Sequence, residues 1–223
     1  MEGNNSLGAL NGFRLCLRRT TRRQALALLL LAGILALAAA LRLVQLASLG
    51  YGNHYYAAAV KSMLQSWHNF FFAAAEPGGS VSVDKPPLGL WLQVFSAYFL
   101  GVNTLGLLLP QLLAGMVSIA VLYHLVQRSF GVAAGLLAAL ALAVTPVAVA
   151  VDRNNTMDST LNVALLLAGG CFLQAAERRS LGRLLCGGAL VGLAFNIKML
   201  AAYLPLPAFF AVYLLGAQEP FWR

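Results

Sequence analysis

Long runs of apolar residues alternate with short polar segments along most of the chain. About 20 predominantly apolar residues in a helix cross the hydrocarbon core of a bilayer. The pattern therefore predicts an all-α polytopic membrane protein with about six transmembrane helices, in the runs 25–41, 105–126, 132–151, 159–176, 184–195 and 200–216. The arginine-rich segment before the first run resembles a signal peptide, but the length of that run and the spans after it favour an uncleaved anchor.

A seventh apolar stretch, residues 83–100, either crosses the membrane or lies along it. If it lies along the membrane, ten of the fifteen Lys and Arg residues are cytoplasmic, as the positive-inside rule favours. If it crosses, the cluster of Arg178, Arg179 and Arg183 is exported. We therefore expect an interfacial segment, which suits the aromatic side chains of 83–100. The protein then has a basic cytoplasmic head (1–23), a transmembrane module (24–216) with an outer loop at 48–101, and a cytoplasmic tail (217–223).

The outer loop has a helical pattern of its own. Apolar positions recur at helical spacing from Tyr55 to Trp67, while Lys61, Ser62 and Gln65 occupy the other face, which predicts an interfacial helix. Residues 76–80 have the composition of a turn. The following Pro86-Pro87 pair suits the first turn of a second interfacial helix.

The composition excludes a soluble globular domain, because 60% of the residues are apolar and 10% are charged, against roughly 45–50% and about 25% in soluble domains. The net charge of +8 lies in short loops between the spans, so it reflects membrane topology rather than nucleic-acid binding. The three cysteines form no C-x-x-C motif and the three histidines are scattered, so we expect no disulfide scaffold and no metal site.

The segment Asp84-Lys85-Pro86-Pro87 stands at the start of the second interfacial helix. Unpaired amides and the positive end of the helix dipole favour an anion there, so Lys85 and the helix start form a candidate phosphate site. In the alternative interpretation Asp84 only caps the helix, and Lys85 is a snorkelling interface residue. The spacing leaves both interpretations open.

Asp152 and Asp158, two of the seven acidic residues, lie in the short outer connection between the third and fourth spans. A helix that begins near Thr156 places Asp158 and Asn162 on one face and carries polarity into the membrane, which makes Asp158 a functional candidate. Alternatively, Thr156 caps the helix and Asp158 complements its dipole. Lys198, after the fifth span, binds either a lipid phosphate or lipid headgroups in general.

These motifs resemble those of one enzyme family. The paired tyrosines of the outer loop and the polar connection occur in the order found in the N-terminal half of the family 39 membrane glycosyltransferases, which have the GT-C fold. Protein O-mannosyltransferases and lipid A aminoarabinose transferases are in the same group. The resemblance covers residues 22–215 and rests on Tyr55-Tyr56, Asp84-Lys85-Pro86-Pro87-Leu88, Gly101-Val102-Asn103, Pro110 and Asp152 to Asp158.

The resemblance implies inverting transfer of a sugar from a polyprenyl-phosphate donor to a glycan, lipid or protein acceptor at the outer face, without a cofactor. Lys85 would hold the donor phosphate with help from Lys198, and Asp158 would line the sugar site as a catalytic residue. Relatives carry an acidic general base just before the paired tyrosines, where this chain has Asn53 and His54. We expect Asp84, rather than His54, to take the acceptor's proton. The other predicted substrate-binding residues are Asn53, His54, Asp152, Arg153, Asn154 and Asn162.

Two further classes of protein remain as alternatives. The missing acid at position 53 favours a non-catalytic lipid-phosphate-binding or assembly subunit that retains the fold. A small transporter would place ionisable residues at the bilayer midplane, whereas here they gather at one membrane face. Because family members continue with more spans, we expect the chain to represent an N-terminal portion. Either it is a fragment or truncated product, or a second chain supplies the C-terminal part.

Overall fold

The computed structural model describes residues 4–216, with side-chain surroundings from residue 22 onward. Across 4–216 the protein is helical, and its β-structure is limited to one isolated bridge between Ala74 and Ser82. The predicted fold class is therefore confirmed. The predicted tail at 217–223 lies outside the described residues.

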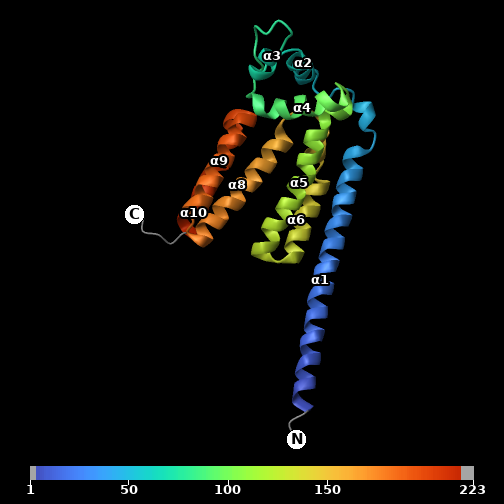
Figure 1. Ribbon diagram of the computed structural model, residues 1–223, viewed down its shortest axis with the longest axis vertical. Helices are drawn as coiled ribbons and strands as arrows, with labels where there is room; N and C mark the ends of the chain where they lie inside the picture. Colours follow the sequence, from blue (N-terminus) through green and yellow to red (C-terminus); the bar gives the residue numbers. More distant parts are fainter. Residues whose placement is uncertain (1–3, 217–223) are drawn as a thin grey trace.

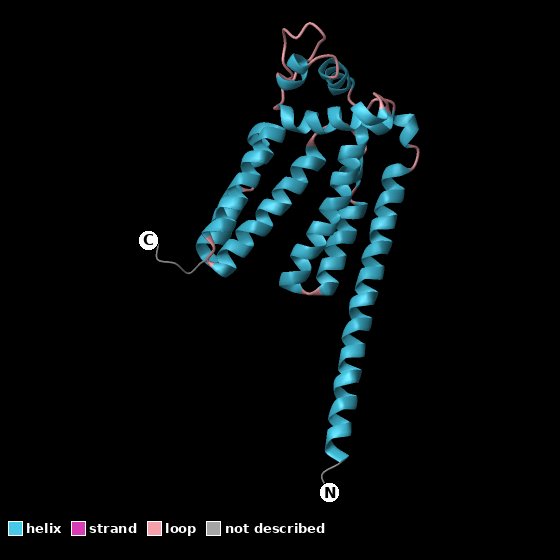
Figure 2. Ribbon diagram, in the orientation of Figure 1, coloured by secondary structure: helices cyan, strands magenta, loops and turns pink. Residues whose placement is uncertain are grey.

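The longer helices run side by side and form a bundle (Figures 1 and 2). Helices α5 and α6 pack against each other and against α1, while α8, α9 and α10 form a second group. These helices are α1 (Asn4–Leu43), α5 (Thr104–Phe130), α6 (Val132–Val144), α8 (Asp158–Arg178), α9 (Leu181–Lys198) and α10 (Leu206–Gly216). Among the described residues, four segments are long and apolar enough to cross a membrane: Arg22–Leu43, Thr104–Phe130, Asp158–Arg178 and Leu181–Tyr203.

The predicted span at 132–151 is broken in two. Helices α6 and α7 (Pro146–Asp152) meet at a bend of 61°. Pro146 has no amide hydrogen and forces the preceding Thr145 to an extended conformation with ψ 119°. The Thr145 hydroxyl donates to the Ala141 carbonyl at 2.6 Å and closes the end of α6. Counting the bent pair as one span gives up to five spans by length.

The last predicted run, 200–216, is also interrupted. Its first residues form the 3-10 helix η2 (Met199–Tyr203), and α10 follows as a helix of 11 residues. Pro205 separates the two because it cannot donate a backbone hydrogen bond. All six predicted runs are therefore helical, but two of them are interrupted at a proline.

Helix α4 (Pro87–Leu100) lies crosswise over one end of the bundle, which we call the α4 end (Figure 1). Its inner face buries Leu90 and Val94, whereas Phe95 and Phe99 on the other face are 67% and 68% exposed. This placement is the one that the charge distribution favours for residues 83–100. The second interfacial helix begins at Pro87, as predicted.

The first interfacial helix is shorter than predicted. It ends at Met63, because Ser66 caps a new helix by accepting a hydrogen bond from the Asn69 amide at 3.1 Å. Ser62, expected on the polar face, is instead buried against Asn69. The elements of this region are η1 (Leu46–Leu49), α2 (His54–Met63) and α3 (Trp67–Phe71).

The largest apolar cluster lies where α2, α4, α8 and α9 meet, and it contains Val60, Leu90, Met157 and Ile197. Close packing depends on Gly89, since a Cβ atom there would lie 2.5 Å from Met157 Cγ. Glycine thus lets α4 approach the ends of α8 and α9. This contact positions the segment before α4, where the candidate site lies.

Candidate active site at the α4 end

Asp84 and Lys85 form an ion pair just before α4, with 2.5 Å between Asp84 Oδ2 and Lys85 Nζ. The pair is partly exposed, and the hydrogen bond from Lys85 to Asp84 raises the pKa of the lysine. The Asp84 amide donates to the Tyr55 hydroxyl of α2 at 3.3 Å. Pro86 is the N-cap of α4, so the interpretation of Asp84 as the helix cap is wrong.

A second ion pair joins the two ends of the α8–α9 hairpin. Asp158, the first residue of α8, bonds to Lys198, the last residue of α9. Two residues earlier, Asn196 accepts a hydrogen bond from the Leu88 amide at 3.3 Å and so connects α9 to the first turn of α4. Met157 is the N-cap of α8 without a side-chain bond, so the alternative in which Thr156 caps the helix is wrong, although Asp158 does lie in the first turn.

The buried Tyr56 phenol lies within electrostatic reach of both pairs. Burial raises its pKa, the carboxylate of Asp84 raises it further, and Asp158 adds a smaller rise, while Lys85 lowers it. Contacts place both pairs at the start of α4, because Asn196, two residues before Lys198, bonds to Leu88, and Met157, next to Asp158, packs against Gly89. The bond from the Asp84 amide to the Tyr55 hydroxyl adds the start of α2, so these segments form one candidate site.

Asn53 supports this site as a helix cap. Its side chain accepts hydrogen bonds from the amides of Tyr55 and Tyr56 at 3.0 and 3.3 Å. The Asn53 amide in turn donates to the side chains of Asn154 and Asn155, at 3.1 and 2.6 Å. The asparagines thereby fix the start of α2 against the connection between α7 and α8.

His54 faces another part of the surface. Its ring lies edge-on to Tyr51, with 6.3 Å between the ring centroids. It lines a cavity of about 540 Å³ together with Lys61 and Val102. The described contacts thus do not bring His54 to the Asp84–Lys85 pair.

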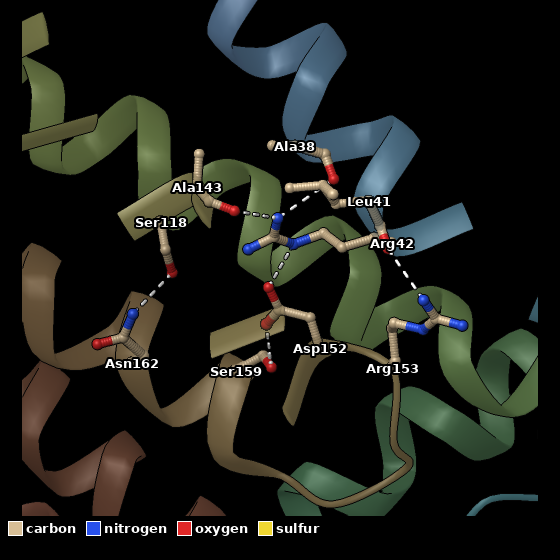
Figure 3. Close-up of polar contacts among 9 residues, drawn as sticks. All are labelled: Ala38, Leu41, Arg42, Ser118, Ala143, Asp152, Arg153, Ser159 and Asn162. Atoms are coloured by element: carbon tan, nitrogen blue, oxygen red, sulfur yellow. Dashed lines mark hydrogen bonds and ion pairs between the residues drawn. The ribbon is translucent and has the colours of Figure 1, made fainter. Parts of the chain in front are cut away.

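Asp152 is held within the bundle rather than at its surface (Figure 3). Its Oδ2 accepts from Arg42 Nε at 2.6 Å, and its Oδ1 accepts from the Ser159 hydroxyl at 2.5 Å. Arg42, on α1, is 1% exposed and also donates to the carbonyls of Ala38 and Ala143. This network ties α1 to α6, α7 and α8.

Two neighbouring residues complete this region. Arg153 donates to the carbonyls of Leu41 and Val44 at 3.0 and 2.8 Å, which caps the end of α1. Asn162 donates to the Ser118 hydroxyl at 3.1 Å (Figure 3). A cavity of about 290 Å³ lies between these helices, and Asp158 and Asn162 are among the side chains that line it. Within the described residues, no three His, Cys, Asp or Glu side chains lie close enough together to hold a metal ion.

The family model described as "Dolichyl-phosphate-mannose-protein mannosyltransferase" matches residues 84–222, which is more than half of the chain. The chain belongs to this family. The resemblance inferred from the motifs is thereby confirmed. The matched region begins at Asp84 and contains Lys85, Asp158 and Lys198, whereas Asn53 lies before it.

Two similar proteins come from Bacillus subtilis (strain 168). The chain is 51% identical over 166 residues to "Putative mannosyltransferase YycA", and the aligned region covers 74% of this chain and 24% of that protein. It is 44% identical over 165 residues to "Putative mannosyltransferase YkcB", and this aligned region covers 74% of the chain and 23% of that protein. The chain thus spans about a quarter of the length of these curated relatives. No solved structure matches it.

Two residues of the candidate site have no role predicted from the sequence. Tyr56 is one of the paired tyrosines and belongs to the helical pattern of the outer loop, and Asn196 stands two residues before Lys198. The signal for Asn196 is an amide in the last turn of an otherwise apolar span, where a polar side chain needs a partner. For Tyr56 the signal is the hydroxyl on an interfacial helix beside a basic motif.

Proposed function

We propose that the chain forms the donor-binding part of a glycosyltransferase that moves a sugar, with inversion, from a polyprenyl-phosphate carrier to an acceptor at the outer face of the membrane. Mannose is the proposed sugar, because the family description and the names of both relatives specify it. The observation that carries the proposal is the position of two lysine–carboxylate pairs at the start of α4, where Asn196 bonds to Leu88 and Met157 packs against Gly89.

The two lysines suit the leaving group. When the acceptor oxygen bonds to the anomeric carbon, the bond from that carbon to the phosphate oxygen breaks and the lipid phosphate departs with the electron pair. Charge grows on the phosphate, and positioned cations stabilise it. Each ammonium has three donors, so Lys85 and Lys198 retain donors for phosphate while each is bonded to its carboxylate.

Asp84 is the proposed general base, which takes the proton from the acceptor hydroxyl. It is the more exposed partner of its pair, with 56% of its side chain accessible, so an acceptor can approach it. Asp158 and Asn162 are proposed to contact sugar hydroxyls from the cavity that they line. Asn53, Asn154, Asp152 and Arg153 are proposed to act through the positions of the helices that they connect.

The test is transfer from a radiolabelled polyprenyl-phosphate mannose by membranes that contain the full chain. We expect Asp84→Asn to lower transfer by about 100-fold or more. Lys85→Ala is expected to weaken donor binding by about ten-fold or more, as for other lost hydrogen bonds to charged groups. Lys61→Ala, an exposed lysine of α2, is the matched control. Equal effects of the two lysine variants would overturn the proposal.

The same assay separates the enzyme from a non-catalytic subunit. Asn53 favours the subunit, because its side chain is an amide already committed to capping α2 and cannot act as a base. Donor binding that depends on Lys85, without transfer, would identify a lipid-phosphate-binding subunit. Transfer that Asp84→Asn leaves intact but His54→Ala abolishes would move the base to His54.

A further inference from the structure

A groove with polar residues at one end lies at the end of the bundle opposite α4. It occupies the space between α1 and the turn that joins α5 to α6, and Figure 1 shows α1 running past this turn. Its volume is about 860 Å³, within the range of about 300–1,000 Å³ for small-molecule sites. The groove shares no residue with the proposed donor site.

The groove is polar at its mouth and apolar along its wall. Arg23, Gln24 and Gln127 are the polar lining residues near the end of the bundle. Leu26 and Leu30 follow Arg23 along α1 at three and seven residues, so they lie on the same face of the helix. At a rise of 1.5 Å per residue, the wall extends about 10 Å from Arg23 to Leu30.

The apolar wall is open toward the bilayer side of α1. Leu26 and Leu30 are 57% and 49% exposed, while Ala27, between them, is buried against the neighbouring helices. A hydrocarbon chain that lies on these leucines would be shielded on one side by protein. A soluble anion would leave the same wall unused.

Arg23 gives the mouth of the groove a positive charge. The sequence has no acidic residue between Glu2 and Glu76. The described ion pairs involve Arg42, Lys85, Arg128 and Lys198, so in the described part of the chain no carboxylate neutralises Arg23. Basic pockets between membrane-spanning helices bind anionic lipid headgroups.

We propose that this groove binds an anionic glycerophospholipid of the surrounding leaflet. Its phosphate lies at Arg23 with the Gln127 amide as a further donor, and one acyl chain follows Leu26 and Leu30. The basic mouth sets the preference for a negative headgroup. The leucine wall restricts the ligand to a lipid rather than free phosphate.

The experiment titrates the purified full chain in a neutral detergent with phosphatidylglycerol or phosphatidylcholine of identical acyl chains. Native mass spectrometry then counts the bound lipids. We expect phosphatidylglycerol to bind more tightly, and Arg23→Gln to weaken its binding by about five-fold, the effect of about one arginine near an anionic lipid. Arg178→Gln removes the same charge from an exposed site at the end of α8 and serves as the control.

The outcomes are distinguishable. Preferential binding of phosphatidylglycerol that Arg23→Gln lowers and Arg178→Gln preserves supports the site. Equal binding of the two lipids would mean annular lipid only. An equal effect of both arginine variants would mean attraction by net charge without a site, and tight binding of inorganic phosphate in competition with the lipid would remove the role of the leucine wall. Each of these three results would overturn the proposal.

Discussion

Gly115 on α5 controls whether the buried Arg42–Asp152 pair can form. A Cβ atom at this position would lie 2.1 Å from Asp152 Oδ2 and 2.3 Å from its Cγ. Both distances are far below van der Waals contact, so Gly115→Ala must displace the carboxylate. Because Asp152 Oδ2 lies only 2.6 Å from Arg42 Nε, that displacement breaks the bond between them.

The size of the effect follows from burial. Arg42 and Asp152 are 1% and 4% exposed, and removing one partner of such a buried pair costs about 3–5 kcal/mol. Replacing glycine with alanine inside a helix returns about 0.5–1 kcal/mol. We therefore expect Gly115→Ala to lower the free energy of unfolding by about 2–4 kcal/mol. At about 2–4 °C per kcal/mol for a chain of this size, Tm falls by about 5–15 °C.

The assay is thermal unfolding of the full chain in a mild detergent, followed by circular dichroism. Gly188→Ala is the matched control, because a Cβ atom there meets no heavy atom within 4 Å. In an Asp152→Ala background, Gly115→Ala should cost almost nothing, since the clashing carboxylate is gone. The reasoning is refuted if the Gly115→Ala and Gly188→Ala variants have the same Tm. It is also refuted if Gly115→Ala lowers Tm by the same amount in the Asp152→Ala background as in the unmodified chain.

Three further predictions concern other contacts. Gly89→Ala should loosen α4 from α8 and α9, because its Cβ atom would lie 2.5 Å from Cγ of Met157, the N-cap of α8. Unchanged hydrogen exchange in α4 would contradict this. Backbone amides hydrogen-bonded to Glu76 lower its pKa from 4.5, so they stabilise the turn at 76–80 above about pH 4.5, and this support is lost as the pH falls through the lower folded pKa. Exchange of the Gly78 and Ser80 amides, measured relative to an unstructured peptide at the same pH, should therefore rise in acid, and Glu76→Gln should abolish this rise. Cys171 and Cys186, with sulfur atoms 3.7 Å apart, should form an intramolecular disulfide with a thiol oxidant when the third cysteine is replaced, and maleimide labelling of both thiols after oxidation would argue against this α8–α9 register.

The helices of the bundle could be predicted from the sequence because each depends on a local property. Apolar runs gave the spans, and the distribution of arginines placed residues 83–100 across the end of the bundle instead of along it. The sequence pattern did not predict the bend at Pro146, because the run remains apolar on both sides of this single proline. The break before Trp67 was missed because the Ser66 cap competes with a continuing apolar pattern.

The candidate site was predicted in part. The Asp84-Lys85 motif is continuous in sequence, so its pairing follows from adjacency. The partners of Asp158 and Asp152 lie 40 and 110 residues away, on Lys198 and Arg42, and only the packing of helices brings them together. Asp152 and Asp158 look equivalent in the sequence, yet Asp152 pairs with Arg42 of α1 within the bundle and Asp158 pairs with Lys198 at the end of α9.

In the proposed reaction, the pairing of each lysine with a carboxylate couples donor binding to the base. Before the donor binds, the Asp84 carboxylate is bonded to Lys85 at 2.5 Å, so the ammonium occupies the oxygen that would accept the acceptor's proton. A donor phosphate that attracts Lys85 competes with Asp84 for the donors of that ammonium. The carboxylate oxygen thus becomes available to the acceptor hydroxyl when the donor is bound, and hydrolysis of the donor by stray water depends on the same step as transfer.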